Sequence, residues 1–290
     1  MNYNFKGNGA LQRGERQSGN SNWWTHQTMS YDWKKRIEAE KFTQPWFDAS
    51  DERFLFAARL FTGKANPFAD LMDLANLAGK RVLEIGCGMG YHSELLAGAG
   101  ARLTSVDISP TSVDATRRRL ALRGLPADVQ LLDAEQLKEK FDPAEFDLIW
   151  SWGVIHHSAH TARIVRQVGA LVKPSGKVKL MVYHLGGMSA YYTVMRRYVA
   201  GFWLGRQLDD LLWTDADGFT ARFYTRDSLS DMMLAFFAKV DIRVFGQDAD
   251  VVMLPRQIRK PFLNMFSNRR QIALASTRGS LLYVEAEQPF

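Results

Sequence analysis

The hydrophobic and polar positions of this chain alternate between two patterns from residue 79 to residue 184. Short apolar runs, each as long as a buried strand, are separated by longer segments in which apolar residues recur at helical spacing. This alternation predicts an α/β fold, with a parallel sheet, right-handed crossovers and helices on both faces. The predicted strands are residues 82–85, 103–106, 129–132, 146–150 and 178–183.

A glycine cluster directly follows the first predicted strand. Gly86, Gly88 and Gly90 alternate with other residues there, and a helical segment begins immediately afterwards. Glycine lets the backbone approach a ligand closely, and a helix N-terminus directs its N–H groups and positive dipole end at that ligand. Asp107 ends the second strand, where a carboxylate can accept both hydroxyls of a ribose. A nucleoside-containing ligand is therefore expected, with a nicotinamide dinucleotide as one option.

The spacing of the glycines argues against a nicotinamide dinucleotide. A dinucleotide fingerprint has the form G-x-G-x-x-G, whereas this chain has V-L-E-I-G-C-G-M-G over residues 82–90. That run resembles the first motif of the class I, Rossmann-like S-adenosylmethionine-dependent methyltransferases. The run S-W-G-V-I-H-H at residues 151–157 resembles a second motif of that family. The resemblance covers residues 81–183. It implies S-adenosyl-L-methionine as methyl donor, S-adenosyl-L-homocysteine as product, and a doubly wound, mostly parallel sheet of seven strands.

The same resemblance divides the chain into segments. Residues 1–22 are polar without periodicity, so we expect a disordered arm there. Family members often fold the segment before the first strand over the cofactor, and many small-molecule methyltransferases place a cap after the fifth strand. The expected organisation is a helical lid over 23–78, the cofactor-binding core over 79–184, a cap insertion over 185–224, and the rest of the sheet with a basic insertion over 225–290.

The resemblance also assigns residues to the cofactor. An acidic residue after the third strand accepts the adenine amino group in the family, and Asp133 stands at that position. After the fourth strand the backbone lies along the methionine part of the cofactor. The residues expected to bind it are Glu84, Gly86, Cys87, Gly88, Gly90, His92, Asp107, Ile108, Asp133, Ala134, Glu135, Ser151, Trp152 and Gly153.

Histidines are the candidate catalytic bases. Methyl transfer from a sulfonium mainly needs alignment of donor and acceptor and at most one base, and an ordinary histidine pKa of about 6.5 suits that role. His184 is our first choice, with Tyr183 beside it, followed by His156 and His157; all follow strands at the ligand-binding edge. A purely structural histidine is the alternative at each position. We expect no metal, because adjacent histidines do not form the i, i+4 pair that metal binding favours.

Aromatic residues before and after the core are candidates for the substrate pocket. Several large amphipathic rings can form the wall of an apolar pocket, although core or rim packing is the alternative for each ring. The candidates are Tyr31, Trp33, Trp46, Tyr191, Tyr192 and Tyr224.

Composition limits the class of protein. The chain has 290 residues, a net charge of +6 and a single cysteine, which excludes an intrachain disulfide and fits a reducing compartment. No apolar run approaches the ~20 residues of a membrane span, so we expect a cytoplasmic protein. Residues 251–284 contain six basic and no acidic residues. This strip is either a solvated face or a surface for nucleic acid, an anionic membrane or an acidic substrate.

The function expected is methyl transfer to an oxygen or nitrogen of a small-molecule metabolite, with secondary metabolism as one setting. The alternatives are methylation of a macromolecule such as RNA or a peptide, and a non-catalytic protein that binds the cofactor. Nucleic acid is the less favoured partner, because the sequence after the fourth strand is Ser-Trp-Gly-Val rather than the Asn-Pro-Pro-Tyr type found in amino-methylating enzymes. The sequence leaves the acceptor and the oligomeric state open, with a homodimer as one option.

Overall fold

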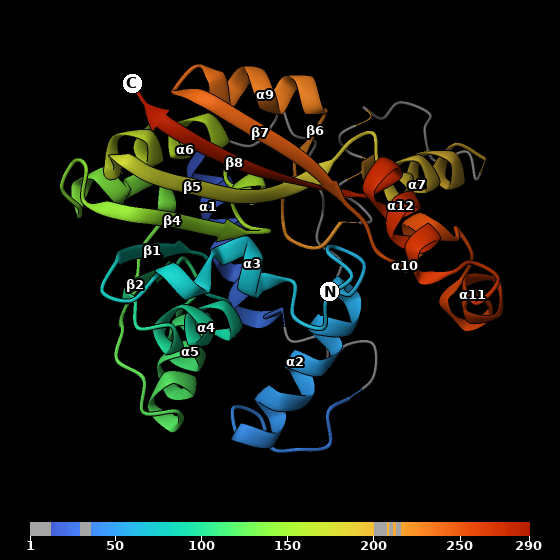
Figure 1. Ribbon diagram of the computed structural model, residues 1–290, viewed down its shortest axis with the longest axis horizontal. Coiled ribbons are helices and arrows are strands. Elements are labelled where there is room, and N and C mark those ends of the chain that lie inside the picture. Colours follow the sequence, from blue (N-terminus) through green and yellow to red (C-terminus); the bar gives the residue numbers. More distant parts are fainter. Residues whose placement is uncertain (1–12, 30–35, 200–207, 209–210, 213–215) are drawn as a thin grey trace.

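The computed structural model describes residues 13–29, 36–199, 208, 211–212 and 216–290. Its centre is one mixed sheet with the strand order β3-β2-β1-β4-β5-β8-β7 (Figure 1). A short strand, β6 (Phe223–Tyr224), pairs in parallel with the end of β5. The long strands are β1 (Arg81–Ile85), β2 (Arg102–Asp107), β3 (Asp128–Leu131), β4 (Phe146–Trp152), β5 (Val172–His184), β7 (Phe237–Phe245) and β8 (Leu281–Pro289).

The strand directions match the expected sheet. Strands β1 to β5 are joined by parallel pairings, whereas β8 pairs antiparallel with both β5 and β7. The prediction of a doubly wound, mostly parallel sheet is confirmed. The order changes direction at β1, because the chain continues from β1 to β2 on one side and later returns to β4 on the other. Ligands bind at such a switch point in open α/β sheets.

Helices cover both faces of the sheet, and each face has its own hydrophobic core. Helices α6 (Thr161–Leu171) and α9 (Arg226–Leu234) lie on one face, where the apolar stripe of α6 packs against β4 and β5 (Figure 1). On the other face lie α3 (Phe68–Met72), α4 (Tyr91–Gly98) and α5 (Pro110–Leu122). The connections after β3 and β4 contain the short 3-10 helices η2 (Ala134–Glu139) and η3 (Ile155–His157), and a third, η1 (Leu74–Asn76), precedes β1.

The N-terminal segment corrects one expectation. Residues 13–22 belong to helix α1 (Arg13–His26) and not to a disordered arm; residues 1–12 lie outside the described part. Few apolar side chains hold α1 in place, which is why the sequence looked disordered. Its attachment is polar: the side chains of Gln17, Asn20 and Ser21 bond to residues of three loops that follow strands. The rest of the expected lid contains α2 (Gln44–Ala58), which packs through buried Trp46 and Phe47.

Among the described residues after β5, four helices lie beyond the sheet. They are α7 (Met188–Val199), α10 (Asp248–Val251), α11 (Arg256–Leu263) and α12 (Asn268–Arg278). Helix α10 contacts α7, α11 and α12, so these helices gather at one end of the molecule (Figure 1). The basic insertion expected between the last two strands therefore forms α11 and α12.

A buried arginine joins α5 to the N-terminal helices. Arg119 is only 1% exposed. Its guanidinium bonds both carboxylate oxygens of Asp51 on α2, with 2.9 Å to Oδ1, and its Nε donates to Glu94 on α4 at 2.7 Å. The Met89 carbonyl in the glycine turn also accepts from this guanidinium, at 3.4 Å. One side chain therefore fixes α2, α4 and the turn relative to α5.

A buried carboxyl group lies under the glycine turn. Glu84 on β1 accepts hydrogen bonds from Ser93 Oγ on α4 and from Ser105 Oγ on β2, the latter at 2.7 Å. Burial raises the pKa of Glu84 to about 7, while the two serine hydroxyls oppose the shift. The group joins β1, β2 and the helix that starts after the turn.

The raised pKa of Glu84 makes stability depend on pH. Because the folded pKa of about 7 lies above the ordinary 4.5, protonated Glu84 contributes stability that is complete below pH 4.5 and lost as the pH rises through 7. The substitution Glu84→Gln keeps an acceptor and removes this titration. We expect the free energy of unfolding of the variant, relative to the native chain, to rise by about 3 kcal/mol between pH 4.5 and pH 8. Urea unfolding at a series of pH values measures it, and a pH-independent difference would contradict the assignment.

Candidate functional site

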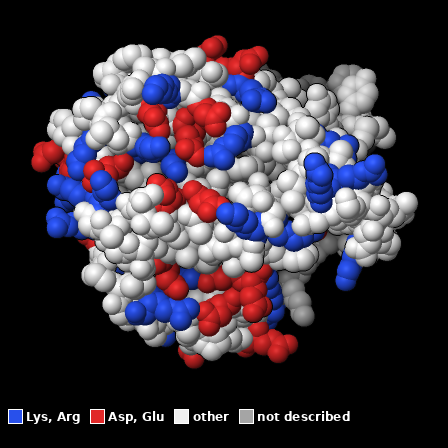
Figure 2. Space-filling view, viewed as in Figure 1, with Lys and Arg blue, Asp and Glu red and all other residues white. Residues whose placement is uncertain are grey.

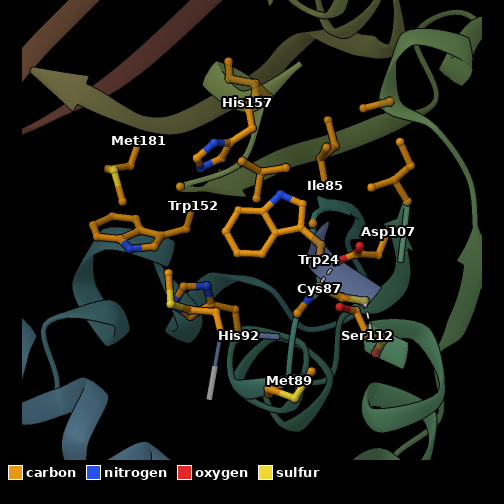
Figure 3. Close-up of a pocket in the computed structure, with 18 of the residues that line it drawn as sticks. Trp24, Ile85, Cys87, Met89, His92, Asp107, Ser112, Trp152, His157 and Met181 are labelled. Carbon is orange, nitrogen blue, oxygen red and sulfur yellow. Dashed lines mark hydrogen bonds between the residues drawn. The ribbon is translucent and has the colours of Figure 1, made fainter. Parts of the chain in front are cut away.

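A cavity of about 330 Å³ lies at the carboxyl edge of the parallel strands (Figure 3). Its walls come from the ends of β1, β2, β4 and β5, from the glycine turn, and from helices α1 and α2. Ten of the expected cofactor residues line it: Gly86, Cys87, Gly88, His92, Asp107, Ile108, Asp133, Ala134, Trp152 and Gly153.

The glycine turn needs the left-handed backbone that glycine permits. Gly86 has a φ of 83° and Gly88 a φ of 53°, and a Cβ on Gly86 would overlap the side chain of Val154. The turn is tied to the end of β2, because the Gly88 N–H donates to Asp107 Oδ2 at 3.0 Å and the Ser109 N–H donates to Oδ1 at 2.9 Å. Burial raises the pKa of Asp107, and these backbone donors oppose the shift. The carboxylate is thus held in a fixed orientation on the cavity wall.

Asp133, the residue expected to accept the adenine amino group, faces α1. The amide nitrogen of Gln17 donates to Asp133 Oδ1 at 2.8 Å and to Oδ2 at 2.9 Å, and the Glu135 N–H also donates to Oδ1 at 2.9 Å. Gln17 Oε1 in turn accepts from the Ala159 N–H at 3.0 Å. An NH₂ group of this chain therefore already bonds the carboxylate that the family uses to bind another NH₂ group.

Four of the expected cofactor residues do not line the cavity. Glu84 lies beneath the turn, and Gly90 is the left-handed residue before α4, packed against Thr116. Glu135 accepts from Ser158 Oγ and from the His160 N–H, so it joins two loops. Ser151 Oγ donates to the Ile85 carbonyl at 3.0 Å between neighbouring strands. The side chains of Glu84, Glu135 and Ser151 support the cavity wall without facing the cavity, because their polar atoms bond to other residues of the chain.

The first-choice base, His184, is not in the cavity wall. Its Nδ1 hydrogen-bonds the Gly279 carbonyl at 2.7 Å, which fastens the end of β5 to the chain just before β8. His156 is fully buried between His157 and Tyr183, with ring centroids 4.1 and 4.0 Å away, and it does not line the cavity either. Burial holds the pKa of His156 well below its usual range. Tyr183 does line the cavity.

His157, the third candidate, is the histidine that reaches the cavity from this edge. Its Nδ1 lies 2.6 Å from the Thr220 carbonyl, and since a carbonyl only accepts, Nδ1 carries the proton. Burial lowers the pKa of His157 to about 4, so the ring is neutral and Nε2 holds a lone pair. Nε2 is buried and has no partner among the described residues. Figure 3 shows the ring pointing toward Trp24 and Trp152, whose side chains form the adjacent walls.

His92 lines the opposite part of the cavity in the other tautomer. The indole N–H of Trp150 donates to its Nδ1 at 3.2 Å, so the proton of the neutral ring lies on Nε2. Burial lowers its pKa to about 3. Nε2 is buried without a partner among the described residues, and the rings of Phe54, Phe68 and Trp152 surround the imidazole. The cavity therefore has one histidine acceptor and one histidine donor.

Four of the six aromatic candidates for the substrate pocket do not line the cavity. Trp46 is buried in the core beside α5, and Tyr191 and Tyr192 are exposed on α7. Tyr224 is half-buried on β6 and does not line the cavity, while Tyr31 and Trp33 fall outside the described residues. Sequence reasoning missed the actual apolar walls. These are Trp24, Met29, Phe54, Phe61 and Met181, together with the polar Gln17, Asn20, Asp51 and Gln247.

Metal binding and membrane crossing can be judged for the described residues alone. Within them, no group of histidine, cysteine or acidic side chains is arranged to hold a metal ion. None of the described helices combines the length and the apolar character that a membrane crossing requires.

Comparison with known proteins identifies the domain that carries the cavity. The family model described as methyltransferase domain matches residues 82–176. These residues are therefore similar to the methyltransferase domain family. The ubiquinone biosynthesis O-methyltransferase of Pseudomonas aeruginosa is 37% identical over 108 residues, which are 37% of this chain and 46% of that protein. The Nitrosococcus oceani protein of that name is 36% identical over 124 residues, 40% of this chain and 52% of the relative. The chain thus matches about half the length of these relatives.

Solved structures extend the likeness of the methyltransferase domain to the fold of nearly the whole chain. Magnesium protoporphyrin IX methyltransferase from Synechocystis, solved with S-adenosylhomocysteine, superposes with a TM-score of 0.55 at 15% identity, over 93% of this chain and 98% of that one. Phosphoethanolamine N-methyltransferase 2 from Haemonchus contortus gives a TM-score of 0.53 at 18% identity, over 87% of this chain and 61% of that one. The fold is that of the class I methyltransferases, as the sequence predicted.

The polar attachment of α1 can be weakened by one substitution. The buried amide of Asn20 donates to the His157 carbonyl at 2.6 Å and accepts from Thr220 Oγ1 at 3.2 Å, so Asn20→Ala removes both bonds, although Thr220 Oγ1 still donates to that carbonyl. We expect hydrogen exchange within residues 13–26 to speed up roughly 5- to 30-fold, which corresponds to about 1–2 kcal/mol. The matched control is Asn22→Ala, which replaces an exposed residue on the same helix. Equal exchange rates in both variants would show that α1 does not depend on these bonds.

Proposed function

We propose that this chain is an S-adenosyl-L-methionine-dependent methyltransferase that methylates an oxygen of a small molecule enclosed in the cavity. The observation that carries the proposal is the buried, unpartnered Nε2 of neutral His157 in the wall of a cavity built at the family's cofactor edge. The curated relatives are named O-methyltransferases, which favours oxygen over nitrogen. The size of the cavity, about 330 Å³, favours a small acceptor over RNA or a peptide.

The residues on the cavity wall fit the cofactor. Asp107 offers an oriented carboxylate for the ribose hydroxyls, and the glycine turn brings backbone close to the ligand. Asp133 would accept the adenine amino group in place of the Gln17 NH₂ group that bonds it in this structure. Trp152 ends β4 and Gly153 follows it, where the family places the methionine part. When bound, the cofactor supplies an electrophilic methyl group on a sulfonium, which leaves as a neutral thioether.

His157 would remove the proton from the attacking hydroxyl. The Thr220 carbonyl holds the proton on Nδ1, so the lone pair of Nε2 is the part of the ring available to the cavity. As the methyl group moves to the acceptor oxygen, the O–H proton passes to Nε2. Its low pKa keeps the ring unprotonated before the reaction but makes it a weak base, so it can take the proton only because the acceptor oxygen becomes strongly acidic as the methyl group bonds to it.

His92 would position the acceptor. Trp150 fixes its tautomer, so its Nε2–H is a permanent donor in an otherwise aromatic part of the wall. An acceptor with a second oxygen, such as a carbonyl or a neighbouring hydroxyl, would satisfy this donor. Because both histidines are neutral, neither would repel the positively charged sulfonium of the donor.

Cofactor binding is the first test. We expect calorimetry to show binding of S-adenosylmethionine and S-adenosylhomocysteine and no binding of NAD. The substitution Asp107→Asn removes the charge that would accept the ribose hydroxyls, and it should weaken binding about 10- to 100-fold. The control Asp128→Asn changes an exposed aspartate at the start of β3. A folded native chain that binds neither adenosyl compound would overturn the proposed function.

Catalysis by His157 has a distinct pH signature. With a panel of phenols, catechols and hydroxy acids as acceptors, we expect His157→Gln to lower kcat about 10²- to 10⁴-fold while cofactor affinity is kept. Because the pKa of His157 is about 4, the native rate should stay level as the pH falls from 8 to 5.5.

The matched variant His184→Gln separates the two candidate bases, because His184 lies outside the cavity wall. It should cost stability and leave kcat within about threefold. Loss of kcat in His184→Gln alone, or an acid limb with a pKa between 6 and 7 that disappears in His157→Gln, would contradict this assignment.

A further inference from the structure

One end of the molecule exposes a group of large hydrophobic side chains. More than half of the large hydrophobic side chains exposed in the described chain lie on α7, on α11 or just beside α11. Met265 is 76% exposed and Tyr191 is 64% exposed. Patches of this kind on a folded protein mark an interaction surface. The members are Tyr191, Tyr192, Met195, Tyr198, Val199, Met253, Ile258, Phe262 and Met265.

Helix α11 shows clearly that these residues form an outer face. Its inner side is anchored by Leu263, which packs with Leu60, Val251 and Ala275 in a small core. Ile258 and Phe262 lie four residues apart on the helix and are about half exposed. Both sides of the helix are therefore apolar, and the protein covers only one of them.

The same end of the molecule is positively charged. The sequence from 253 to 278 has six basic and no acidic residues, and Lys260, Arg269 and Arg270 are exposed there. Helix α7 carries Arg196 and Arg197 and no acidic residue. Helix α10 contacts α7, α11 and α12, which places the two apolar faces at the same end. On the face seen in Figure 2, this end shows Lys and Arg among uncharged residues, while the acidic residues lie elsewhere.

We propose that α7, α11 and the start of α12 dock the protein on an anionic lipid bilayer. Exposed aliphatic and aromatic side chains gain free energy when they enter the boundary between headgroups and acyl chains, and basic side chains around them are attracted to anionic headgroups. A nucleic acid would use the charges and leave Ile258, Phe262 and Met265 in water. A second copy of the chain would bring two basic surfaces together, which like charges oppose.

This surface is distinct from the cavity but structurally connected to it. Gln247 precedes α10, where its N–H donates to Asp250 Oδ2 at 2.8 Å and its carbonyl accepts from the Asp250 N–H at 2.9 Å. Gln247 also lines the cavity, as does Leu281 at the start of β8. The docking proposal concerns binding alone and does not rest on the methyl transfer proposed above. Its test therefore uses vesicles without cofactor, while calorimetry with S-adenosylhomocysteine reports separately on the cavity.

The experiment is co-sedimentation of the full chain with vesicles. We expect binding to mixed phosphatidylcholine and phosphatidylglycerol vesicles to be at least about tenfold stronger than to pure phosphatidylcholine, and to weaken as NaCl is raised. Equal binding to both vesicles, or none to either, would overturn the proposal.

Two pairs of variants test which residues act. The variant Ile258→Glu/Phe262→Glu should lose binding about tenfold or more, whereas Leu122→Glu/Leu131→Glu, which makes the same change at exposed sites on α5 and β3, should not. Arg269→Ser/Arg270→Ser should lose binding at low salt, whereas Arg118→Ser/Lys140→Ser should not.

All variants must still bind S-adenosylhomocysteine as the native chain does, which shows that they are folded; unfolding temperatures serve this purpose if the native chain does not bind it. Vesicle binding that survives both substitutions on the docking surface would overturn the proposal. So would a concentration-dependent dimer, or binding of single-stranded RNA, that the same substitutions abolish in place of vesicle binding.

Discussion

The buried guanidinium of Arg119 is the constraint on which the arrangement of the site depends. It bonds carboxylates on two different helices and the backbone of the glycine turn, and it is itself shielded from water. A buried charge of this kind is stable only while its partners stay in place, and its loss leaves Asp51 and Glu94 without their counter-charge. The turn that shapes the cofactor edge and the helices that wall the cavity are therefore held as one unit. Asp51 takes part in both the bonding to Arg119 and the cavity wall, because it also lines the cavity.

The cavity has carboxylate groups at the strand ends and two uncharged histidines in its other walls. Carboxylates stand where the strands β2 and β3 end, each oriented by backbone or side-chain N–H groups. Between them and the aromatic wall, His92 and His157 are both uncharged, and each has its tautomer fixed by one neighbour of this chain. Burial disfavours charge on both rings, so desolvation keeps them neutral, and the neighbouring Trp150 and Thr220 then set which nitrogen donates and which accepts.

The features that the sequence predicts are those encoded by neighbouring residues. The strands, the glycine turn and the placement of Asp107 and Asp133 follow from short apolar runs and from what stands at their ends. The choice between His184 and His157 could not be made in this way, because both follow strands at the same edge. It depends on Gly279 and Thr220, carbonyl groups 95 and 63 residues away. The aromatic wall was missed for a similar reason, since Trp24 lies on α1, whose position depends on side-chain bonds to loops distant in the sequence.

Helix α1 has a consequence for the kinetics of whatever binds in the cavity. It contributes Gln17, Asn20 and Trp24 to the wall, yet its attachment to the loops after β2, β3 and β4 is mainly through side-chain hydrogen bonds. Each such bond contributes only about 1 kcal/mol, so the helix can detach while the sheet stays intact. Ligand residence time is then set by a local opening of the first helix. The Asn20 amide, which bonds the backbone carbonyl of His157, thus becomes a means of tuning how fast a bound molecule leaves.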